Sequence, residues 1–194
     1  MPTLFWVLFA YCVLERLGEL VISRRNQKGM KRRGFSEKET SSGVRWMIAL
    51  HASWYVAMLV EVACVPSSLP AAIYCGAAGL FLGAQMLRFW ALRTLGAFWN
   101  ISVVTADPCV PAFVYHGPYR FIRHPNYLVV IVEIATLPLV GGAMLTSCIF
   151  TVLNGLVLAR RIPLEESYLF RISGYRDVMG GKGRFFPRGL LRRR

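Results

Sequence analysis

Length, composition and charge place this chain in a membrane. It has 194 residues, of which 55% are hydrophobic, and a formal net charge of +13. Soluble domains have about 45–50% apolar residues, whereas several stretches here approach the ~20 apolar residues that cross a bilayer. The sequence therefore predicts an integral membrane protein with one helix bundle, and it excludes a sizeable separate soluble domain.

The positive charge lies where the positive-inside rule places it. Apart from Arg16, the lysines and arginines fall into groups within Ser23–Arg45, within Arg88–Arg123 and from Arg160 onward, and each group flanks a hydrophobic stretch. This pattern favours cytoplasmic loops and contact with anionic membrane lipids, and it argues against nucleic-acid binding. The five cysteines form no CxxC pair and the three histidines are scattered, so we expect no metal site.

Five apolar stretches predict five membrane helices. Their ranges are Leu4–Ile22, Trp46–Val65, Ala71–Leu92, Asn126–Val140 and Ala143–Ala159. The first stretch lacks a preceding basic region and a clear cleavage site, so we expect it to stay as a membrane helix rather than be removed as a signal peptide. The last two stretches are short, which leaves open a tilted or partly re-entrant hairpin.

The segments between these stretches predict the topology. Ser23–Arg45 is strongly basic and is expected to be a cytoplasmic loop, whereas Pro66–Pro70 carries no charge and suits the outer side. The N-terminus is then outside and the C-terminus inside. Within the third stretch, Gly79 and Gly83 form a GxxxG pattern, which favours close packing of helices.

A polar motif, GPYRFIRHPNY, precedes the fourth stretch. Pro125 suits the first turn of a helix, which leaves His124 at the helix N-terminus and Tyr127 about one turn further on. Free backbone N–H groups, the helix dipole and the positive charge of Arg120 and Arg123 favour an anion there. The motif indicates either a site for a small polar ligand or an interfacial belt of Tyr and Arg at lipid headgroups.

A second motif, RRIPLEESY, follows the fifth stretch. Arg161 and Glu165 are neighbours on a helix and could simply pair with each other. Alternatively, a carboxylate could hold the ammonium group of a ligand while the arginine holds an anion. A third segment, LGAFWNISV, contains Gly96 and Trp99; alone it indicates little more than an aromatic membrane anchor.

Together these three motifs resemble those of the isoprenylcysteine carboxyl methyltransferase family. The matching residues are Leu95-Gly96-x₂-Trp99, Gly117-x-Tyr119-x₃-Arg123-His124-Pro125-x-Tyr127 and Arg161-x-Pro163-x-Glu165-Glu166. The resemblance covers Leu95 to Pro187, and the N-terminal helices match only as hydrophobic spans. The family often has Leu where Phe113 stands and Gly where Val129 stands, so the acceptor tunnel could differ in shape.

The resemblance implies an all-α, polytopic membrane bundle of about five transmembrane helices with a cytosolic cofactor pocket. Residues 1–92 would supply three helices and the basic loop, and residues 93–194 the catalytic region. The implied cofactor is S-adenosylmethionine, and its implied contacts are Phe113, Val114, Tyr119, His124, Pro125, Asn126, Tyr127 and Glu165. Arg161 would lie beside the methyl-accepting group. The membrane would be the plasma or inner membrane of a prokaryote, or the endoplasmic reticulum of a eukaryote.

The implied activity is O-methylation of a lipophilic acceptor, either an isoprenylcysteine-like carboxylate or a hydroxyl. A carboxylate is already ionised and needs only an orienting cation, whereas a phenol or enol needs a group that takes its proton. Glu133, an acid inside the apolar run, is a candidate for that role, although a hydrogen bond between helices would also explain it. His51 and Glu61 are candidates of lower priority for the same role, and we expect them to pack inside the bundle.

Three other functions stay open at this stage. Phospholipid N-methylation would change only the acceptor. A sterol-type membrane reductase would use a nicotinamide cofactor and shares an Arg-His-Pro-Asn-Tyr stretch, but it lacks the Arg161–Glu166 element. A non-catalytic membrane scaffold would leave the three polar motifs unexplained. The sequence leaves the oligomeric state open.

Overall fold

The computed structural model describes residues 2–32, 36–37, 41–66, 69–100, 104–105 and 113–188. Within these ranges the regular secondary structure is helical apart from one antiparallel pair of two-residue strands, in which Ser36 lies opposite Thr105. The elements are α1 (Pro2–Arg32), β1 (Ser36–Glu37), α2 (Ser41–Cys64), α3 (Ala71–Leu95), η1 (Gly96–Phe98), β2 (Val104–Thr105), η2 (Gly117–Arg120), α4 (Pro125–Gly141), α5 (Met144–Leu169) and α6 (Tyr175–Met179).

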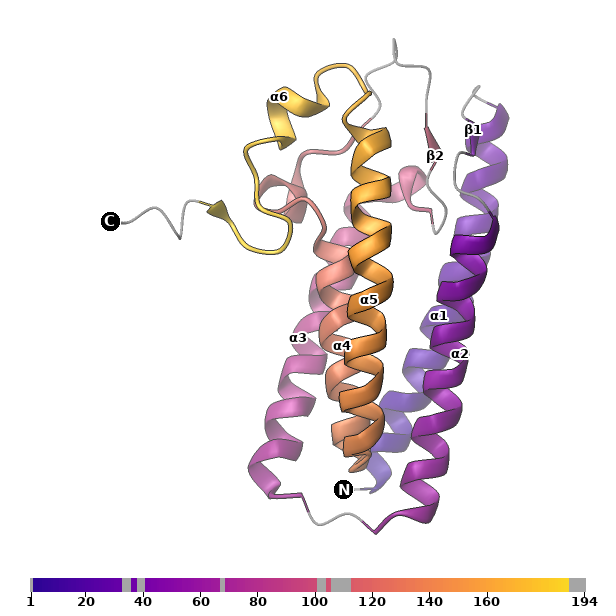
Figure 1. The fold of residues 1–194 in the computed structure, drawn as a ribbon, viewed down its shortest axis with the longest axis vertical. Coiled ribbons are helices and arrows are strands. Elements are labelled where there is room, and N and C mark those ends of the chain that lie inside the picture. The colour runs from indigo at the N-terminus through magenta and orange to yellow at the C-terminus, as the bar shows by residue number, and fades with distance from the viewer. Residues whose placement is uncertain are drawn as a thin grey trace.

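The long helices run side by side along one axis (Figure 1). α3 packs along α4, and α4 packs along α5, while α1 and α2 each contact α4 as well. α4 is therefore central, which agrees with its sequence, because it is apolar on nearly all sides. The N-terminus lies at one end of the bundle, and the end of α5, α6 and the following segment lie at the other.

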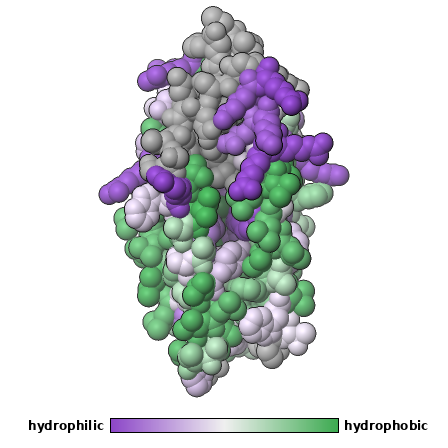
Figure 2. Space-filling model, turned by 90° about the vertical axis from the view of Figure 1, so that its right-hand side faces the viewer, coloured by the Kyte–Doolittle hydropathy of each residue, from purple (hydrophilic) through white to green (hydrophobic). Residues whose placement is uncertain are grey.

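The bundle has the surface of a membrane protein. Three helical segments within the described residues are long and apolar enough to cross a membrane: Val44–Cys64, Ala71–Phe98 and Met144–Leu169. α4 is shorter, and α1 carries Glu15, Arg16 and Glu19 in its apolar stretch. Figure 2 shows hydrophobic side chains over the lower part of one face and hydrophilic side chains around the upper part. The predicted all-α membrane bundle is confirmed; five membrane passes stay a prediction.

The helix ends differ from the predicted ones. α1 continues ten residues beyond Ile22, and α5 continues ten residues beyond Ala159. The basic segment after Ile22 was predicted as a loop, but Lys, Arg, Gln and Met favour helix, and Lys31 and Arg32 suit the negative end of the helix dipole. The basic residues after Ile22 therefore mark the edge of the apolar layer, but α1 continues through them.

The GxxxG pattern does not pack against the part of this chain that the structure describes. Gly79 and Gly83 are exposed, and a Cβ atom on either would meet nothing within 4 Å among the described residues. The prediction of close helix packing at this stripe is therefore wrong within the single chain. The apolar core lies on other faces, and its largest fully buried members include Phe5, Trp54, Met58, Phe81, Ile134 and Leu137.

Glu133 lies at the centre of the bundle with no exposed surface. Its carboxylate accepts a hydrogen bond from Cys12 Sγ at 2.6 Å and forms ion pairs with Arg16 and Arg88. The sequence left open a catalytic role and a hydrogen bond between helices, and the structure places Glu133 in contact with α1 and α3. An unpaired charge at this depth is costly, so these partners make its burial tolerable.

Arg88 carries this network further across the bundle. Its fully buried guanidinium contacts Glu19 at 2.8 Å and Glu15 at 3.5 Å in addition to Glu133. Arg16 contacts Glu19 at 2.7 Å. Cys12, Glu15 and Glu133 have ligand atoms within 4.8 Å of one another, but the two guanidiniums already neutralise much of this negative charge and disfavour a cation there.

Glu61 of α2 caps the start of α5. The residue before α5 is Ala143, which has no side-chain acceptor, and the backbone N–H groups of Leu145 and Thr146 donate to the Glu61 carboxylate at 2.8 and 2.7 Å. Thr146 Oγ1 also donates to it at 2.6 Å. Glu61 was expected to pack inside the bundle, and it does so at the start of α5.

We expect Glu61→Ala to lower the free energy of unfolding by about 2 kcal/mol, because buried N–H groups at the start of α5 lose their acceptor. Unfolding in mixed detergent–SDS micelles, followed by circular dichroism, measures this. Glu61→Gln keeps one acceptor oxygen and should cost less. Equal stability of Glu61→Ala and the wild type would contradict the cap.

Candidate active site

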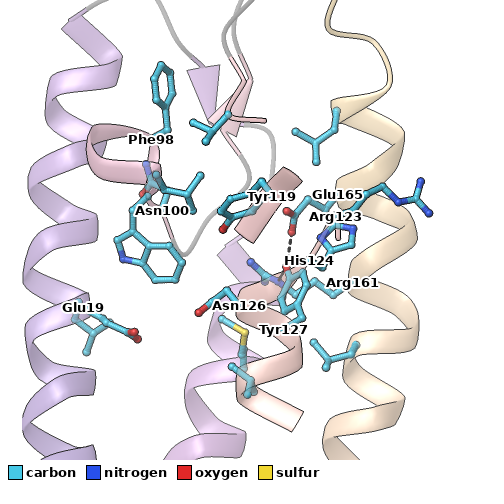
Figure 3. Close-up of a pocket in the computed structure, with 18 of the residues that line it drawn as sticks. Glu19, Phe98, Asn100, Tyr119, Arg123, His124, Asn126, Tyr127, Arg161 and Glu165 are labelled. Carbon is cyan, nitrogen blue, oxygen red and sulfur yellow. Dashed lines mark hydrogen bonds between the residues drawn. The ribbon is translucent and has the colours of Figure 1, made fainter. Parts of the chain in front are cut away.

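A cavity of about 450 Å³ opens between α1 and α2 on one side and α4, α5 and the C-terminal segment on the other. This volume lies within the range of small-molecule sites, about 300–1,000 Å³. The lining includes most of the residues singled out in the sequence: Phe113, Val114, Tyr119, His124, Asn126, Tyr127, Arg161 and Glu165. Figure 3 shows Tyr119, His124 and Glu165 grouped on one side, with Glu19 of α1 on the opposite wall.

Two of the predicted site residues are not part of this lining as the structure describes it. Pro125 is fully buried and forms the first turn of α4, where it sets the helix direction. Glu133 lies deeper in the bundle, inside the ion-pair network. Its oxygens contact Cys12, Arg16 and Arg88, so the structure does not bring Glu133 to this lining, and its catalytic role stays a prediction.

The turn before α4 is held by close packing and by the C-terminal segment. Gly117 has φ +58°, and a Cβ atom there would lie 2.4 Å from Thr94 Oγ1, so only glycine suits this position. The N–H of Arg123 donates to the carbonyl of Gly183 at 2.9 Å, and that of His124 donates to Arg184 at 3.0 Å. The segment after α6 therefore fixes the backbone of the motif.

Glu166 joins three basic side chains beneath this turn. It is 5% exposed, lies 3.1 Å from His124 Nε2 and 3.3 Å from Arg123 Nη2, and accepts from Arg184 Nη2 at 2.6 Å. Sequence reasoning chose Glu165 and missed both Glu166 and Arg184. The adjacent pair of carboxylates was the only signal for Glu166, and nothing local pointed to Arg184.

Glu165 and Arg161 meet at Tyr127. The hydroxyl of Tyr127 donates to Glu165 and accepts from Arg161 Nε at 2.7 Å. Two helices, α4 and α5, therefore bring the separate sequence motifs into contact, with a carboxylate and a guanidinium side by side at the cavity wall. Such a pair can bind an ammonium or sulfonium group and an anion together.

The extension of α1 holds the third motif. Asn26 donates to the carbonyls of Gly96 at 3.1 Å and Trp99 at 2.9 Å, and Ser23 donates to Asn100 at 2.9 Å. Trp99 is 6% exposed and lines the cavity, so it is more than a membrane anchor. Ser23, Asn26 and Asn100 were missed because the helix was predicted to end at Ile22.

Burial and neighbouring charges set the protonation of groups near the cavity. Burial raises the pKa of the Tyr119 and Tyr175 hydroxyls above their usual range, so both stay protonated at neutral pH. Burial, with a smaller effect of Arg120, lowers the pKa of Lys182, whose Nζ donates to the Tyr119 carbonyl at 2.9 Å. The hydrogen bond to Glu166 raises the pKa of Arg184.

Unpartnered polar atoms gather at this cavity. Among the described residues, six buried side-chain nitrogen or oxygen atoms have no hydrogen-bond partner, and all but Trp54 Nε1 belong to residues that line the cavity. These are Arg16 Nε, His51 Nε2, Trp99 Nε1, Arg123 Nε and Asn126 Oδ1. A buried polar atom without a partner costs about 1–3 kcal/mol, so their gathering here indicates a polar ligand.

The fold and the site define a helical membrane protein with a small-molecule cavity at its polar end. Residues 77–171 match the model of the isoprenylcysteine carboxyl methyltransferase (ICMT) family. The uncharacterized protein YpbQ of Bacillus subtilis (strain 168) is 34% identical over 166 residues, which cover 86% of this chain and 96% of YpbQ. An uncharacterized protein of Haemophilus influenzae is 27% identical over 164 residues, covering 83% and 92% of the two chains.

The structure of the eukaryotic intramembrane Ras methyltransferase ICMT has a similar fold. The TM-score is 0.54 at 22% identity, and the similarity covers 75% of this chain and 53% of that one, so this chain corresponds to about half of the eukaryotic structure. The chain belongs to the isoprenylcysteine carboxyl methyltransferase family. It is a helical membrane protein of that family.

Proposed function

We propose that this protein transfers a methyl group from S-adenosylmethionine to an oxygen of a lipophilic acceptor, either a carboxylate of the isoprenylcysteine kind or a hydroxyl. The observation that carries the proposal is the gathering of unpartnered buried polar atoms on residues of one cavity. Family membership supports the methyl transfer, and the mainly apolar lining supports a lipophilic acceptor.

The residues of the α4–α5 side of the cavity suit S-adenosylmethionine. Asn126 Oδ1 and Arg123 Nε, together with Trp99 Nε1 from the segment after η1, supply an acceptor and donors that lack partners among the described residues. Phe113, Val114 and Tyr119 supply apolar and aromatic surface for a flat base, with Pro125 fixing the turn beside them. Glu165 offers a carboxylate to a positively charged ligand group.

In the bound complex the cofactor supplies an electrophilic methyl group on a sulfonium. The protein positions the acceptor and excludes water. Opposite charges disappear when a sulfonium reacts with an oxyanion, so a site with less water favours the reaction. Arg161, at the wall beside Tyr127 and Glu165, would orient a carboxylate acceptor. Tyr127 would hold Arg161 and Glu165 in place through its hydroxyl.

The location of the site suits a substrate that arrives from the membrane. The cavity lies toward the end of the bundle where hydrophilic side chains gather in Figure 2. The last turns of α1 and the segment after α5 are rich in Lys and Arg. We propose that this end faces the cytosol, because cytoplasmic segments carry an excess of Lys and Arg. A greasy acceptor could enter between helices, while the cofactor enters from water.

We expect the detergent-purified protein to bind S-adenosylhomocysteine, and Glu165→Gln to weaken this binding at least ~10-fold, because a carboxylate facing a charged ligand group is lost. Isothermal titration calorimetry measures it. Asp177→Asn is the matched control, since it makes the same chemical change on an exposed residue of α6 outside the cavity.

If the folded wild type does not bind S-adenosylhomocysteine, the proposed use of S-adenosylmethionine is wrong. The non-catalytic scaffold and the sterol-type reductase would then be the functions to test. Equal weakening by Glu165→Gln and Asp177→Asn would contradict the assignment of Glu165.

A further inference from the structure

The cavity has a second wall that the proposed cofactor site does not use. It is formed by one face each of α1 and α2, and its residues recur with helical spacing: Val13, Arg16, Leu17, Glu19 and Leu20 on α1, and Met47, Ile48, His51, Ala52 and Tyr55 on α2. This wall is mostly apolar, and it lies outside the segment 77–171 that matches the family. The segment that defines the family therefore supplies one wall, and the N-terminal helices supply the wall that can distinguish acceptors.

His51 is the polar group of α2 in this wall whose hydrogen bonding is incomplete. Its Nδ1 lies 2.8 Å from the carbonyl oxygen of Met47, one turn earlier in α2. A carbonyl oxygen only accepts, so the neutral imidazole carries its proton on Nδ1, and Nε2 presents a lone pair. This Nε2 atom is buried and has no partner among the residues that the structure describes.

The lone pair on His51 Nε2 discriminates between a carboxylate acceptor and a hydroxyl acceptor, the two kinds that the proposed function allows. A carboxylate brings further lone pairs toward Nε2 and leaves it unsatisfied. A hydroxyl brings a proton that Nε2 can accept. The same wall contains Arg16, whose Nε has no hydrogen-bond partner among the described residues and can donate to the acceptor oxygen, while its two terminal nitrogens pair with Glu19 and Glu133.

We propose that the α1–α2 wall holds a lipophilic enol or phenol, and that His51 accepts the hydroxyl proton during methyl transfer; this rests on the proposed function. The acceptor oxygen forms its bond to the methyl carbon of the sulfonium donor while the carbon–sulfur bond breaks and its electron pair stays on sulfur. The hydroxyl proton passes to Nε2. A sulfonium and a neutral imidazole become a thioether and an imidazolium, so the total charge is unchanged.

Acceptors of different acidity test this directly. A long-chain alkylphenol stays protonated at neutral pH, whereas the same molecule with two ring nitro groups is already ionised and needs no base. N-acetyl-S-farnesylcysteine offers a carboxylate instead. Transfer of a labelled methyl group from S-adenosylmethionine gives kcat/KM for each acceptor, and calorimetry with S-adenosylhomocysteine reports the cofactor site independently of turnover.

The diagnostic variant is His51→Asn, which keeps an N–H donor within reach of the Met47 carbonyl but has no Nε2. We expect kcat/KM to fall about 100-fold or more for the alkylphenol, the range of general-base catalysis, with little change for the dinitro compound or for S-adenosylhomocysteine affinity. His116→Asn is the control, because His116 is exposed and lies outside the cavity lining.

Equal losses for the two phenols would show that His51 shapes the wall without taking a proton, and would overturn the proposal. So would a wild type that binds S-adenosylhomocysteine but methylates only the farnesylcysteine carboxylate or neither phenol; the proposed cofactor would stand in that case. A wild type that binds no S-adenosylhomocysteine would remove the proposed function, and this proposal with it.

Discussion

Replacing Glu166 by alanine is expected to weaken S-adenosylhomocysteine binding about 100-fold and to lower the unfolding temperature. Glu166 is the common partner of Arg123, His124 and Arg184. Truncating one partner of a buried, hydrogen-bonded charge pair costs about 2–5 kcal/mol, because the groups left behind stay desolvated without a counter-charge. The turn before α4 would lose the Arg184 contact to Glu166 at the same time.

Calorimetry on the folded variant measures the binding, and thermal unfolding in detergent measures the stability. Glu166→Gln keeps an acceptor oxygen for one of the three partners, so it should lie between the wild type and the alanine variant. If Glu166→Ala binds S-adenosylhomocysteine as tightly as the wild type, the cluster supports the fold and not the cofactor site.

The charge network inside the bundle makes a second prediction, in which two substitutions have unequal effects. The network contains the carboxylates Glu15, Glu19 and Glu133 and the guanidiniums of Arg16 and Arg88. With every group ionised its formal charge is −1, from three negative and two positive groups. Losing an arginine worsens this imbalance, whereas losing a carboxylate corrects it.

We therefore expect Arg88→Leu to lower the free energy of unfolding by about 3–5 kcal/mol, the usual cost of leaving buried charges unpaired. Glu133→Gln should cost about 1 kcal/mol or less, because two carboxylates then face two guanidiniums and the amide oxygen still accepts. Arg88→Lys should not restore stability, since a point charge cannot reach three carboxylates as a planar guanidinium does.

Unfolding in mixed detergent–SDS micelles gives both values, and methyl transfer by Glu133→Gln tests the catalytic hypothesis for Glu133. We expect turnover to be retained across pH in the folded variant, because Glu133 lies outside the cavity lining of the described structure. A large loss of stability in Glu133→Gln with none in Arg88→Leu would contradict the charge count.

The sequence predicted what depends on local pattern. Apolar runs located the long helices, because a span must satisfy its backbone and cover itself with hydrocarbon. The His124-Pro125 pair located the start of α4, since proline is tolerated in a first turn and the residue before it is not helical. The motifs around Tyr119, Tyr127 and Glu165 met in one cavity, although their binding to a cofactor stays a prediction.

The parts that could not be predicted depend on distant contacts. Arg184 meets Glu166 only because a segment beyond α6 folds back along the turn at Ile122. Asn26 contacts Trp99 because α1 continues beyond the apolar layer. The prediction ended this helix at Ile22 because charged residues such as Arg24 follow, but these residues do not end a helix. The sequence suggested a catalytic role for Glu133 because its partners could not be seen locally. They lie on other helices, and Arg16 is more than 100 residues away in the chain.

The hydrogen bonds from Arg123 and His124 to the segment around Gly183 have a consequence for biosynthesis. All the long helices precede that segment in the chain, so they can enter the membrane before the turn is held in place. A nascent chain that ends within α6 would have a bundle but lack the Arg184 contact to Glu166. The turn that carries Arg123 and His124 would then be held in place only after the bundle helices have entered the membrane and residues 183 and 184 have been made.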